Sequence, residues 1–530
     1  MKLRLAALAA AALIPSGIDV MAAAGASKAF DVTEKSVEQL QDAMTKGRIT
    51  SKALTALYLA RIRALDKAGP RLNSVIEVNP DALSIAAALD KERKEKGPRG
   101  PLHGIPVLIK DNIATADRMQ TTAGSLALIG VKPPRDSFVA AKLREAGAVI
   151  LGKTNLSEWA NIRSTRSTSG WSARGGLTRN PYALDRNTSG SSSGSGAAIA
   201  ASLAAVAIGT ETDGSITSPA NANGLVGIKP TVGLVSRAGI IPIAHSQDTA
   251  GPMTRTVADA AALLTAIAGT DARDEATREA SAKAVDYTKL LDPNALKGAR
   301  IGVVRSQLSV ARNDLVAVEI EKALDVMRSQ GATLIDIPEL PNMGKYGATE
   351  LAVLLYELKA DLAAYLAEWA PGAPVKTLAD LIAFNEQHRD QEMPYFGQEQ
   401  FIAAEAKGGL DSKEYLDALA NNQKLSRAEG IDKALADNQL DALVAPSGQP
   451  AWLIDFIKGD ASGGGFTSPA AVAGYPHITV PAGFVRGLPC GISFVGTAWS
   501  EPKLIALAYA FEQASKARRA PKFPKTVNSW

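Results

Sequence analysis

The chain has 530 residues, of which 46% are hydrophobic and 21% are charged, values that are typical of a globular protein with a large core. Its formal net charge is only +4, and the Lys and Arg residues are scattered along the chain, so binding to nucleic acid is not expected. Cys490 is the only cysteine, which excludes an intramolecular disulfide and a cysteine-rich zinc site.

The first residues have the pattern of a secretory signal peptide. Lys2 and Arg4 precede an apolar run at residues 5–14, and small residues follow up to Ala26. A charged start, a short apolar region and an Ala-x-Ala site are the three parts of such a peptide, and the run is shorter than the ~20 residues of a membrane-spanning helix. We expect residues 1–26 to be a signal peptide, so that the protein is periplasmic or secreted, without stable membrane insertion. A frayed N-terminal helix of the mature fold is the alternative.

Helix and strand patterns alternate along most of the mature chain. Helices are expected at residues 36–46, 51–68, 137–146, 258–268, 315–328 and 501–516. Strands are expected at residues 105–109, 148–151, 301–304, 333–337, 440–445, 477–480 and 490–495. Such alternation predicts an α/β fold, in which a sheet is covered by helices on both faces.

Residues 343–437 differ from the rest because helical patterns predominate and strand patterns are few. No linker rich in Pro, Gly and Ser separates them from their neighbours. We therefore expect a helical lobe on the sheet, within one domain that spans residues 27–530.

Gly and Ser residues crowd two short stretches in the first half of the chain. Residues 190–196 read Gly-Ser-Ser-Ser-Gly-Ser-Gly before a helical pattern at 197–205, and residues 209–215 end in Gly214 and Ser215. Gly beside a helix start lets the backbone approach a ligand and direct N–H groups at it. Acyl transfer requires a nucleophilic Ser with such N–H groups nearby. The pattern of a phosphate-binding P-loop is absent from this stretch.

A second pattern places the nucleophile elsewhere. Residues 190–194 also match G-x-S-x-G, the nucleophile elbow of α/β-hydrolases, with Ser192 at the centre. That motif requires a strand before it, whereas residues 180–187 have the composition of a loop. His245 and His477 follow in the chain and could complete a Ser–His–Asp triad, which is an alternative mechanism.

Together with an upstream Lys, these loops resemble the amidase signature family. Its motifs are a Gly/Ser-rich loop, a helix, a G-T-[DE]-x-x-G-S loop, and G-[IV]-P-x-x-x-K-D further upstream. They are matched by residues 190–196, 209–215 and 104–111. The resemblance implies the amidase signature fold, with a central mixed twisted sheet covered by helices on both faces, and a serine amidohydrolase.

The resemblance also implies a role for each site residue. Ser215 attacks the amide carbonyl, Ser191 relays a proton, and Lys110 acts first as a base and then as an acid. The oxyanion is held by the backbone N–H groups of four residues, namely Thr212, Asp213, Gly214 and Ser215. Asn161 lies where relatives bind the substrate backbone. No metal and no organic cofactor is required.

This mechanism requires Lys110 to be uncharged at rest. An ordinary Lys side chain has a pKa of ~10.4, and burial disfavours the charged form. The apolar residues 107–109 that precede Lys110 predict such burial. We expect Asp111 to face away from the amine, since its negative charge would oppose the lowering of the Lys110 pKa. We also expect Glu211 to support the loop that carries Ser215.

Shorter stretches narrow the resemblance to bacterial peptide amidases, which remove ammonia from C-terminal peptide amides. These stretches are residues 171–176, 211–215 and 498–502. At the positions of Glu211 and Asp213, the commonest sequence in the family has Asp and Gly, respectively. A peptide amide or another small-molecule amide is therefore the expected substrate. An aryl, acyl or lactam amidase, an esterase and an inactive binding protein are the alternatives, while the signal peptide argues against the branch that acts on transfer RNA.

Overall fold

The structure is a computed structural model that describes residues 30–309, 314–461 and 465–527. Its contacts divide the chain into Met1–Asp31 and Val32–Trp530, and all the helices and strands given below lie in the second unit. The predicted signal peptide, residues 1–26, lies outside the described residues. Within the described ranges, no helix combines the length and the apolar character needed to cross a membrane.

An eleven-stranded sheet forms the centre of the unit. Strand β2 is parallel to β3 and β6, strand β9 is parallel to β10 and β11, and the other pairs are antiparallel, which makes the sheet mixed, as the resemblance implies. In sheet order, the strands are β1 (Val75–Val78), β3 (Val149–Thr154), β2 (Pro106–Lys110), β6 (Val206–Glu211), β8 (Thr249–Thr254), β7 (Val226–Lys229), β12 (His477–Val485), β13 (Leu488–Val495), β11 (Ala442–Pro446), β9 (Arg300–Val304) and β10 (Thr333–Ile337).

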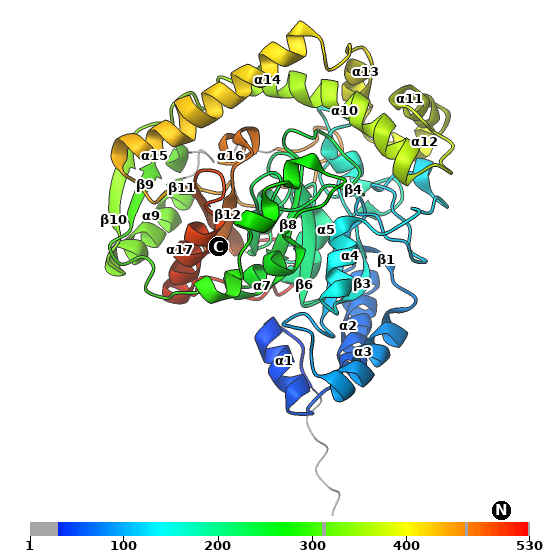
Figure 1. Cartoon of the computed structure of the whole chain (residues 1–530), viewed down its shortest axis with the longest axis horizontal. Coiled ribbons are helices and arrows are strands. Elements are labelled where there is room, and N and C mark those ends of the chain that lie inside the picture. Colours follow the sequence, from blue (N-terminus) through cyan, green and yellow to red (C-terminus); the bar gives the residue numbers. More distant parts are fainter. Residues whose placement is uncertain (1–29, 310–313, 462–464, 528–530) are drawn as a thin grey trace, which may run out of the picture. The chain divides into compact units, whose positions relative to one another are not determined.

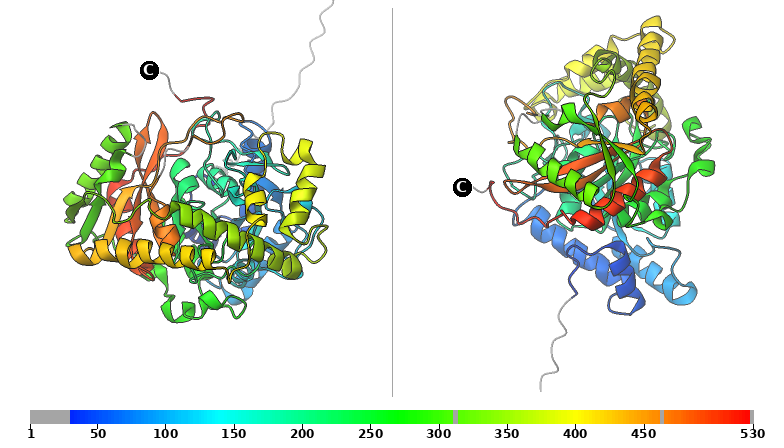
Figure 2. Two further views of the ribbon diagram at one scale, coloured as in Figure 1. Left: turned by 90° about the horizontal axis from the view of Figure 1, so that it is seen from above. Right: turned by 90° about the vertical axis from the view of Figure 1, so that its left-hand side faces the viewer.

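Helices lie on both sides of these strands (Figure 2), as predicted. Helices α4, α7, α17 and α9 contact one another in series, while α5 and α6 contact each other and strands near the middle of the sheet. Outside the lobe, the helices are α1 (Val37–Thr45), α2 (Ser51–Arg61), α3 (Ala82–Lys96), α4 (Phe138–Glu145), α5 (Ser193–Ala200), α6 (Thr217–Ala222), α7 (Val257–Ile267), α8 (Ala280–Lys283), α9 (Asp314–Ser329), α16 (Ser468–Ala473) and α17 (Glu501–Ser515).

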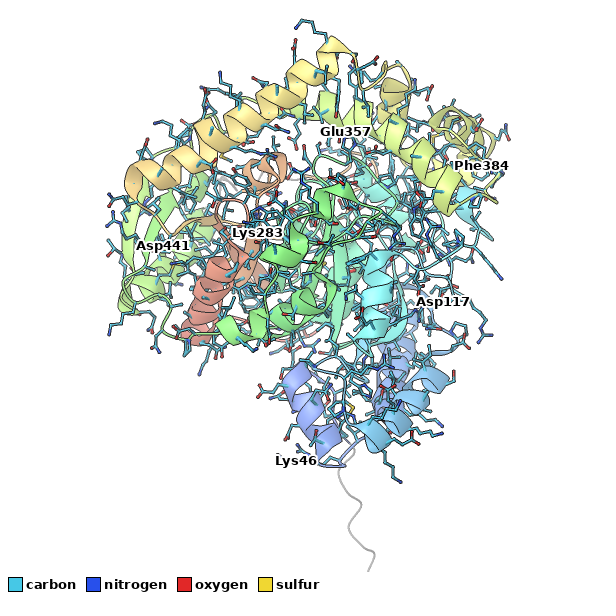
Figure 3. The ribbon with its side chains drawn as sticks, in the orientation of Figure 1. Lys46, Asp117, Lys283, Glu357, Phe384 and Asp441 are labelled. Atoms are coloured by element: carbon cyan, nitrogen blue, oxygen red, sulfur yellow. The ribbon has the colours of Figure 1, made fainter. Side chains whose placement is uncertain are left out.

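The predicted helical lobe is present, and Figure 1 shows its long helices α10 and α14 side by side. Glu357 and Phe384 mark its position in Figure 3. Leu358 and Leu362 of α10 share a buried apolar cluster with Trp159 and Ile241, which belong to segments outside the lobe. The lobe consists of α10 (Gly347–Trp369), α11 (Leu378–Gln387), α12 (Arg389–Glu392), α13 (Glu399–Glu405), α14 (Lys413–Ser426) and α15 (Asp432–Asn438).

One helix begins earlier than its sequence predicts. The pattern predicted a helix over residues 197–205, but α5 covers Ser193–Ala200, and strand β6 begins at Val206. Packing requires a glycine at position 194 of this stretch, because a Cβ atom there would lie 2.3 Å from the Ser74 carbonyl oxygen and 2.5 Å from that of Asn155. The close approach of two other segments therefore explains a composition that is otherwise unfavourable in a helix.

Candidate active site

The site lies where two neighbouring parallel strands end. Strands β2 and β6 pair in parallel, so Lys110 at the end of β2 and Glu211 at the end of β6 lie at the same edge of the sheet. The carboxyl ends of parallel strands are a common position for ligand sites in α/β proteins. All residues of both strands are buried, because helices cover the sheet there.

Lys110 is fully buried and has three hydrogen-bonding contacts at its amine. The Nζ atom lies 2.7 Å from Ser191 Oγ, 2.9 Å from Thr210 Oγ1 and 3.3 Å from the Thr210 carbonyl oxygen. Burial lowers the pKa of Lys110 to about 7, although the negative charges of Asp248 and Glu211 oppose this shift. The amine is therefore uncharged in a large fraction of molecules at neutral pH.

Asp111 has partners other than the Lys110 amine, in agreement with the expectation that it faces elsewhere. Its carboxylate accepts hydrogen bonds from Arg174 Nη1 at 3.1 Å and from the Thr122 hydroxyl. Its charge is thereby compensated by a cation of its own.

Hydrogen bonds join the segment around Ser191 to two other parts of the site. Ser191 is fully buried, and the peptide bond that joins it to Gly190 is cis. The Ser157 N–H donates to the Ser191 carbonyl oxygen at 3.1 Å, and the Ser192 N–H donates to the Ser215 carbonyl oxygen at 3.1 Å. The chain around Ser191 is therefore held against the residue predicted to be the nucleophile.

The loop at residues 212–215 has free donors next to Ser215. In the described part of the chain, no acceptor is found for the backbone N–H groups of these four residues, and Gly214 has a φ of +77°. The next two N–H groups differ, because Ile216 and Thr217 donate to Glu211 Oε2 at 2.7 and 2.9 Å. Glu211 therefore supports the end of the loop, as expected, and leaves the N–H groups of residues 212–215 available.

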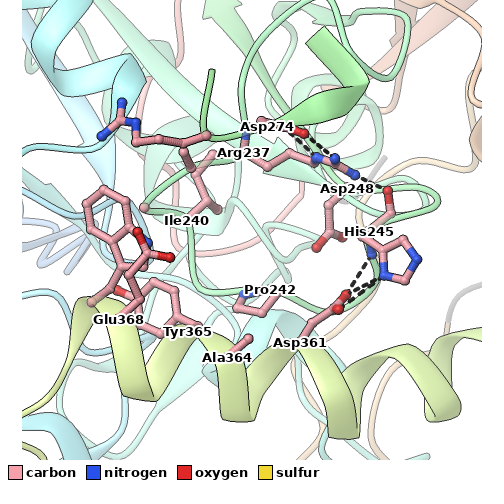
Figure 4. Close-up of a pocket in the computed structure, with 14 residues that line it drawn as sticks. Arg237, Ile240, Pro242, His245, Asp248, Asp274, Asp361, Ala364, Tyr365 and Glu368 are labelled. Atoms are coloured by element: carbon pink, nitrogen blue, oxygen red, sulfur yellow. Dashed lines mark hydrogen bonds and ion pairs between the residues drawn. The ribbon is translucent and has the colours of Figure 1, made fainter. Parts of the chain in front are cut away.

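Asp248 supports the same loop through a different contact, and no motif in the sequence indicates this residue. It accepts a hydrogen bond from the Thr212 hydroxyl at 2.5 Å and from the backbone N–H groups of Ile243 and Ala244 at 2.8 and 3.0 Å. Burial raises its pKa to about 6. Figure 4 shows Asp248 beside a cavity of about 240 Å³ whose wall also includes His245.

Thr210 and Ser157 are two further residues of the site that were not predicted from the sequence. Thr210 contacts the Lys110 amine with its hydroxyl and its carbonyl, and Ser157 binds the Ser191 carbonyl. Thr210 lay within the recognised G-T-E motif, which was the available signal. Nothing in the local sequence indicated Ser157.

Asn161 belongs to a segment that borders this pocket. Its Oδ1 atom is buried without a hydrogen-bond partner among the described residues. The preceding residue, Ala160, lines a small cavity together with Thr210, Thr212 and Asp248. The structure therefore brings the segment of Asn161 to the loops that carry the other predicted site residues.

A second cavity, of about 280 Å³, is lined in part by residues that neighbour Gly214. Ser218 and Thr467 line it, and their hydroxyl oxygens would lie 2.9 and 3.2 Å from a Cβ atom at Gly214. Other lining residues are Ser189, Asn221, Ala222, Gly448, Gln449, Trp452, Gly465 and Ser468. Its wall is polar and carries hydrogen-bonding groups without a charged side chain.

The alternative nucleophile Ser192 is bound to the backbone. Its hydroxyl donates to the Thr210 carbonyl oxygen and accepts from the Thr210 N–H, both at 3.1 Å. His477 is buried beside Ser493, at 2.6 Å, and burial lowers its pKa to about 3. His245 contacts Asp361 instead, at 2.9 Å (Figure 4). The hydrogen bonds of these groups do not form a Ser–His–Asp triad around Ser192.

Cys490 is buried within β13, which contains the predicted strand at residues 490–495. Burial raises the pKa of its thiol to about 12. Since the thiolate is the reactive form, this residue is unsuited to nucleophilic catalysis.

Among the described residues, one group of side chains has the spacing to hold a metal ion, namely His245, Glu357 and Asp361. Their polar atoms already have protein partners. Glu357 accepts from the Ser246 N–H and from the Tyr415 hydroxyl at 2.9 and 2.7 Å, and Asp361 accepts from the His245 backbone and ring. A metal ion would have to replace these hydrogen bonds, so we assign it no role.

Comparisons with known proteins give similarities along nearly the whole chain. A family model described as Amidase matches residues 53–505. The peptide amidase PAM in complex with the competitive inhibitor chymostatin is 55% identical with a TM-score of 0.90, over 93% of this chain and 100% of that chain. The native peptide amidase from Stenotrophomonas maltophilia is 55% identical with a TM-score of 0.87, over 93% and 99% of the two chains. A "Probable amidase" of Arabidopsis thaliana is 46% identical over 94% of this chain and 93% of the relative.

Replacement of Glu211 tests its support of the loop. Glu211→Ala leaves two buried N–H groups without their acceptor, which costs about 1–3 kcal/mol for each group. We expect a lower midpoint of thermal unfolding and slower labelling of Ser215 by a fluorophosphonate. Glu211→Gln keeps one acceptor oxygen and serves as the matched control with a smaller loss. Equal effects of the two substitutions would contradict this role.

Proposed function

The chain belongs to the amidase signature family, and we propose that it releases ammonia from the C-terminal carboxamide of peptides through a Ser–Ser–Lys mechanism. The family and the amidase activity follow from the matched motifs and from the similarity along the chain. The likeness to bacterial peptide amidases, expected from the sequence, is confirmed by two solved structures. The substrate and the roles of individual residues are our proposal.

The observation that carries the proposal is the contact between Lys110 and Ser191. A fully buried amine whose pKa is about 7 lies 2.7 Å from a hydroxyl. A base that works at neutral pH requires a pKa near 7, and an ordinary Lys does not have one. Lys153 and Lys229 are also fully buried and donate to hydroxyl or carbonyl oxygens. Lys110 differs from them because its amine meets Ser191, a serine of the Gly/Ser-rich motif.

The reaction follows from these groups in two stages. Uncharged Lys110 accepts a proton from Ser191, which takes the proton of Ser215 as the Ser215 oxygen bonds to the amide carbon. Lys110 then returns the proton through Ser191 to the departing nitrogen, so the C–N bond breaks and ammonia leaves an acyl-enzyme. Water attacks the ester through the same relay, which releases the carboxylic acid and restores Ser215.

The developing negative charge is held by the loop next to Ser215. The free N–H groups at residues 212–215 are backbone dipoles that Glu211 and Asp248 hold in place. Such preorganised donors need no rearrangement when the charge appears, and the loss of a single donor typically costs about 10²–10³ in rate.

A peptide amide suits the surroundings of this loop. The cavity of about 280 Å³ has polar walls that can bind the amide groups of a peptide, and Asn161 has a buried carbonyl oxygen that is free to accept a hydrogen bond. The 55% identity to peptide amidases supports this choice over an aryl, acyl or lactam amide or an ester.

Ammonia release from a panel of peptide amides is the direct test. We expect hydrolysis by the wild-type protein and a loss of about 10³-fold or more in kcat/KM for both Lys110→Ala and Ser215→Ala. His245→Ala, His477→Ala and Cys490→Ala serve as controls that keep most of the activity. Hydrolysis of aryl amides or esters alone, with normal labelling of Ser215, would contradict the substrate but keep the mechanism.

The pH dependence of the reaction tests the role of Lys110. Since the base must be uncharged, kcat/KM should rise with pH through an acid limb near the pKa of about 7. Asp248→Asn removes a negative charge that favours charged Lys110, so the pKa falls and the limb moves to lower pH. Asp441→Asn removes an acid that is paired with Lys503 and should leave the limb in place. A limb unmoved by Asp248→Asn would contradict the assignment.

We also propose that the protein is exported, on the signal-like pattern of residues 1–26. Fractionation of the host cell followed by N-terminal sequencing should find a chain that begins near residue 27 outside the cytosol. A chain that keeps Met1 and stays in the cytosol would contradict export without affecting the proposed reaction.

A further inference from the structure

Three consecutive residues beside the site adopt the left-handed backbone conformation. Trp159, Ala160 and Asn161 have φ angles of +49°, +52° and +78°. Residues with a Cβ atom adopt this region at a cost, and a run of three persists only if its surroundings hold it. The run is anchored at Trp159, whose N–H donates to the Ala123 carbonyl oxygen at 3.0 Å and whose ring packs edge-on against Phe401.

This left-handed run, residues 159–161, is positioned to affect catalysis. It begins two residues after Ser157, whose N–H binds the Ser191 carbonyl oxygen. Its middle residue, Ala160, lines the small cavity that Thr210 and Thr212 share. Its last residue, Asn161, has a buried oxygen without a partner among the described residues. A change in its conformation would move this oxygen relative to the reacting groups.

A buried ion pair joins the two ends of the run. Glu158 precedes it and Arg163 follows it, and both side chains are fully buried. Arg163 Nη1 donates a hydrogen bond to Glu158 Oε1. The other oxygen of Glu158 accepts from the Ala173 N–H at 2.6 Å. The ion pair therefore restricts the distance between the ends of the left-handed run.

The same guanidinium attaches the run to the helical lobe. Arg163 Nη1 donates to the carbonyl oxygen of Glu392, at the end of α12, at 2.6 Å, and lies 3.7 Å from Glu392 Oε2. The guanidinium carbon lies 4.4 Å from the ring centroid of Phe396, just beyond α12. Glu392 in turn accepts from the Ser125 hydroxyl and the Leu126 N–H at 3.0 and 2.8 Å.

This cluster is poorly built for stability alone. Two carboxylates face one guanidinium, and Arg163 Nε and Nη2 are buried without acceptors in the described structure. Buried ion pairs add little to stability compared with apolar packing, and unpaired buried donors are unfavourable. Its geometry is better explained by a role in holding the left-handed run, residues 159–161, in place.

We propose that Arg163 is a positioning residue for the amidase reaction, which joins Glu158 to Glu392 of the lobe and thereby holds residues 159–161 so that Asn161 meets the substrate. The proposal rests on the proposed function and deepens it. It also gives the helical lobe a role in catalysis, because Glu392 of α12 is one of the two residues that Arg163 joins.

The test is a double-mutant cycle with Arg163→Lys and Asn161→Ala, measured on the peptide amide that the wild-type protein hydrolyses fastest. Arg163→Lys keeps a cation but shortens the side chain and loses the planar guanidinium that lies over the Phe396 ring. We expect about a tenfold or larger loss of kcat/KM in each single variant, mainly through KM, since small misplacements can cost about 10²-fold. If Arg163 acts through Asn161, the second substitution adds little to the first.

Two further measurements distinguish a positioning role of Arg163 from a general loss of stability. A small fluorophosphonate reacts with Ser215 without needing a contact to Asn161. Ser215 in the Arg163→Lys variant should therefore be labelled at a rate within about twofold of the wild-type rate. Arg255→Lys is the matched control, because Arg255 is another buried Arg that donates to backbone carbonyls, those of Ile199 in the last turn of α5 and of Ala204 after α5. It should lower the unfolding temperature without raising KM.

Losses that multiply in the cycle, or labelling that falls in parallel with hydrolysis, would overturn the proposal. If Arg163→Lys does not fold, Glu158→Gln breaks the same ion pair while keeping an acceptor for the Ala173 N–H, and it should give the same result. Activity retained in Lys110→Ala and Ser215→Ala would instead refute the proposed function. The two failures are therefore distinguishable.

Discussion

Burial of the Lys110 amine is the constraint on which the rest of the site depends. An amine loses its proton at neutral pH only if the charged form is made unfavourable, and here the sheet provides this environment. Strand β2 is buried along its whole length, and Lys110 at its end contacts Ser191 and Thr210. The hydroxyl and carbonyl oxygens around the amine satisfy its hydrogen bonds without adding a charge.

Nearby carboxylates limit how far this shift can go. Asp248 and Glu211 both favour the charged form of Lys110, yet both are needed to hold the loop next to Ser215 through hydrogen bonds. The protein keeps each acid in contact with hydroxyl or N–H groups, and burial raises the pKa of both. A base and an oxyanion site can therefore share one pocket, because the acids that shape the loop do not bind the amine directly.

The helical lobe contacts the segment beside the pocket that we propose meets the substrate. Its helix α10 packs on the apolar cluster that includes Trp159, and Glu392 of α12 meets the guanidinium of Arg163. A strained segment beside the pocket is thus held by contacts from a part of the chain more than 200 residues away. In the proposed mechanism, the lobe keeps the substrate contacts in register with the catalytic groups on the sheet.

The sequence by itself determined the fold class, the family, the candidate catalytic groups and part of the strands and helices, because local periodicity and motif spacing depend on neighbouring residues. It did not predict strands β1, β6, β7 and β8. It could not place the start of α5 at Ser193, since close packing on Ser74 and Asn155 decided it. Nor could it identify Asp248 or Arg163 as parts of the site, because the contacts that place them there, with Thr212 and with Glu392, join residues 36 and 229 positions apart in the chain. Tertiary structure alone decided these features, since contacts between distant segments fix burial, charge compensation and strained backbone.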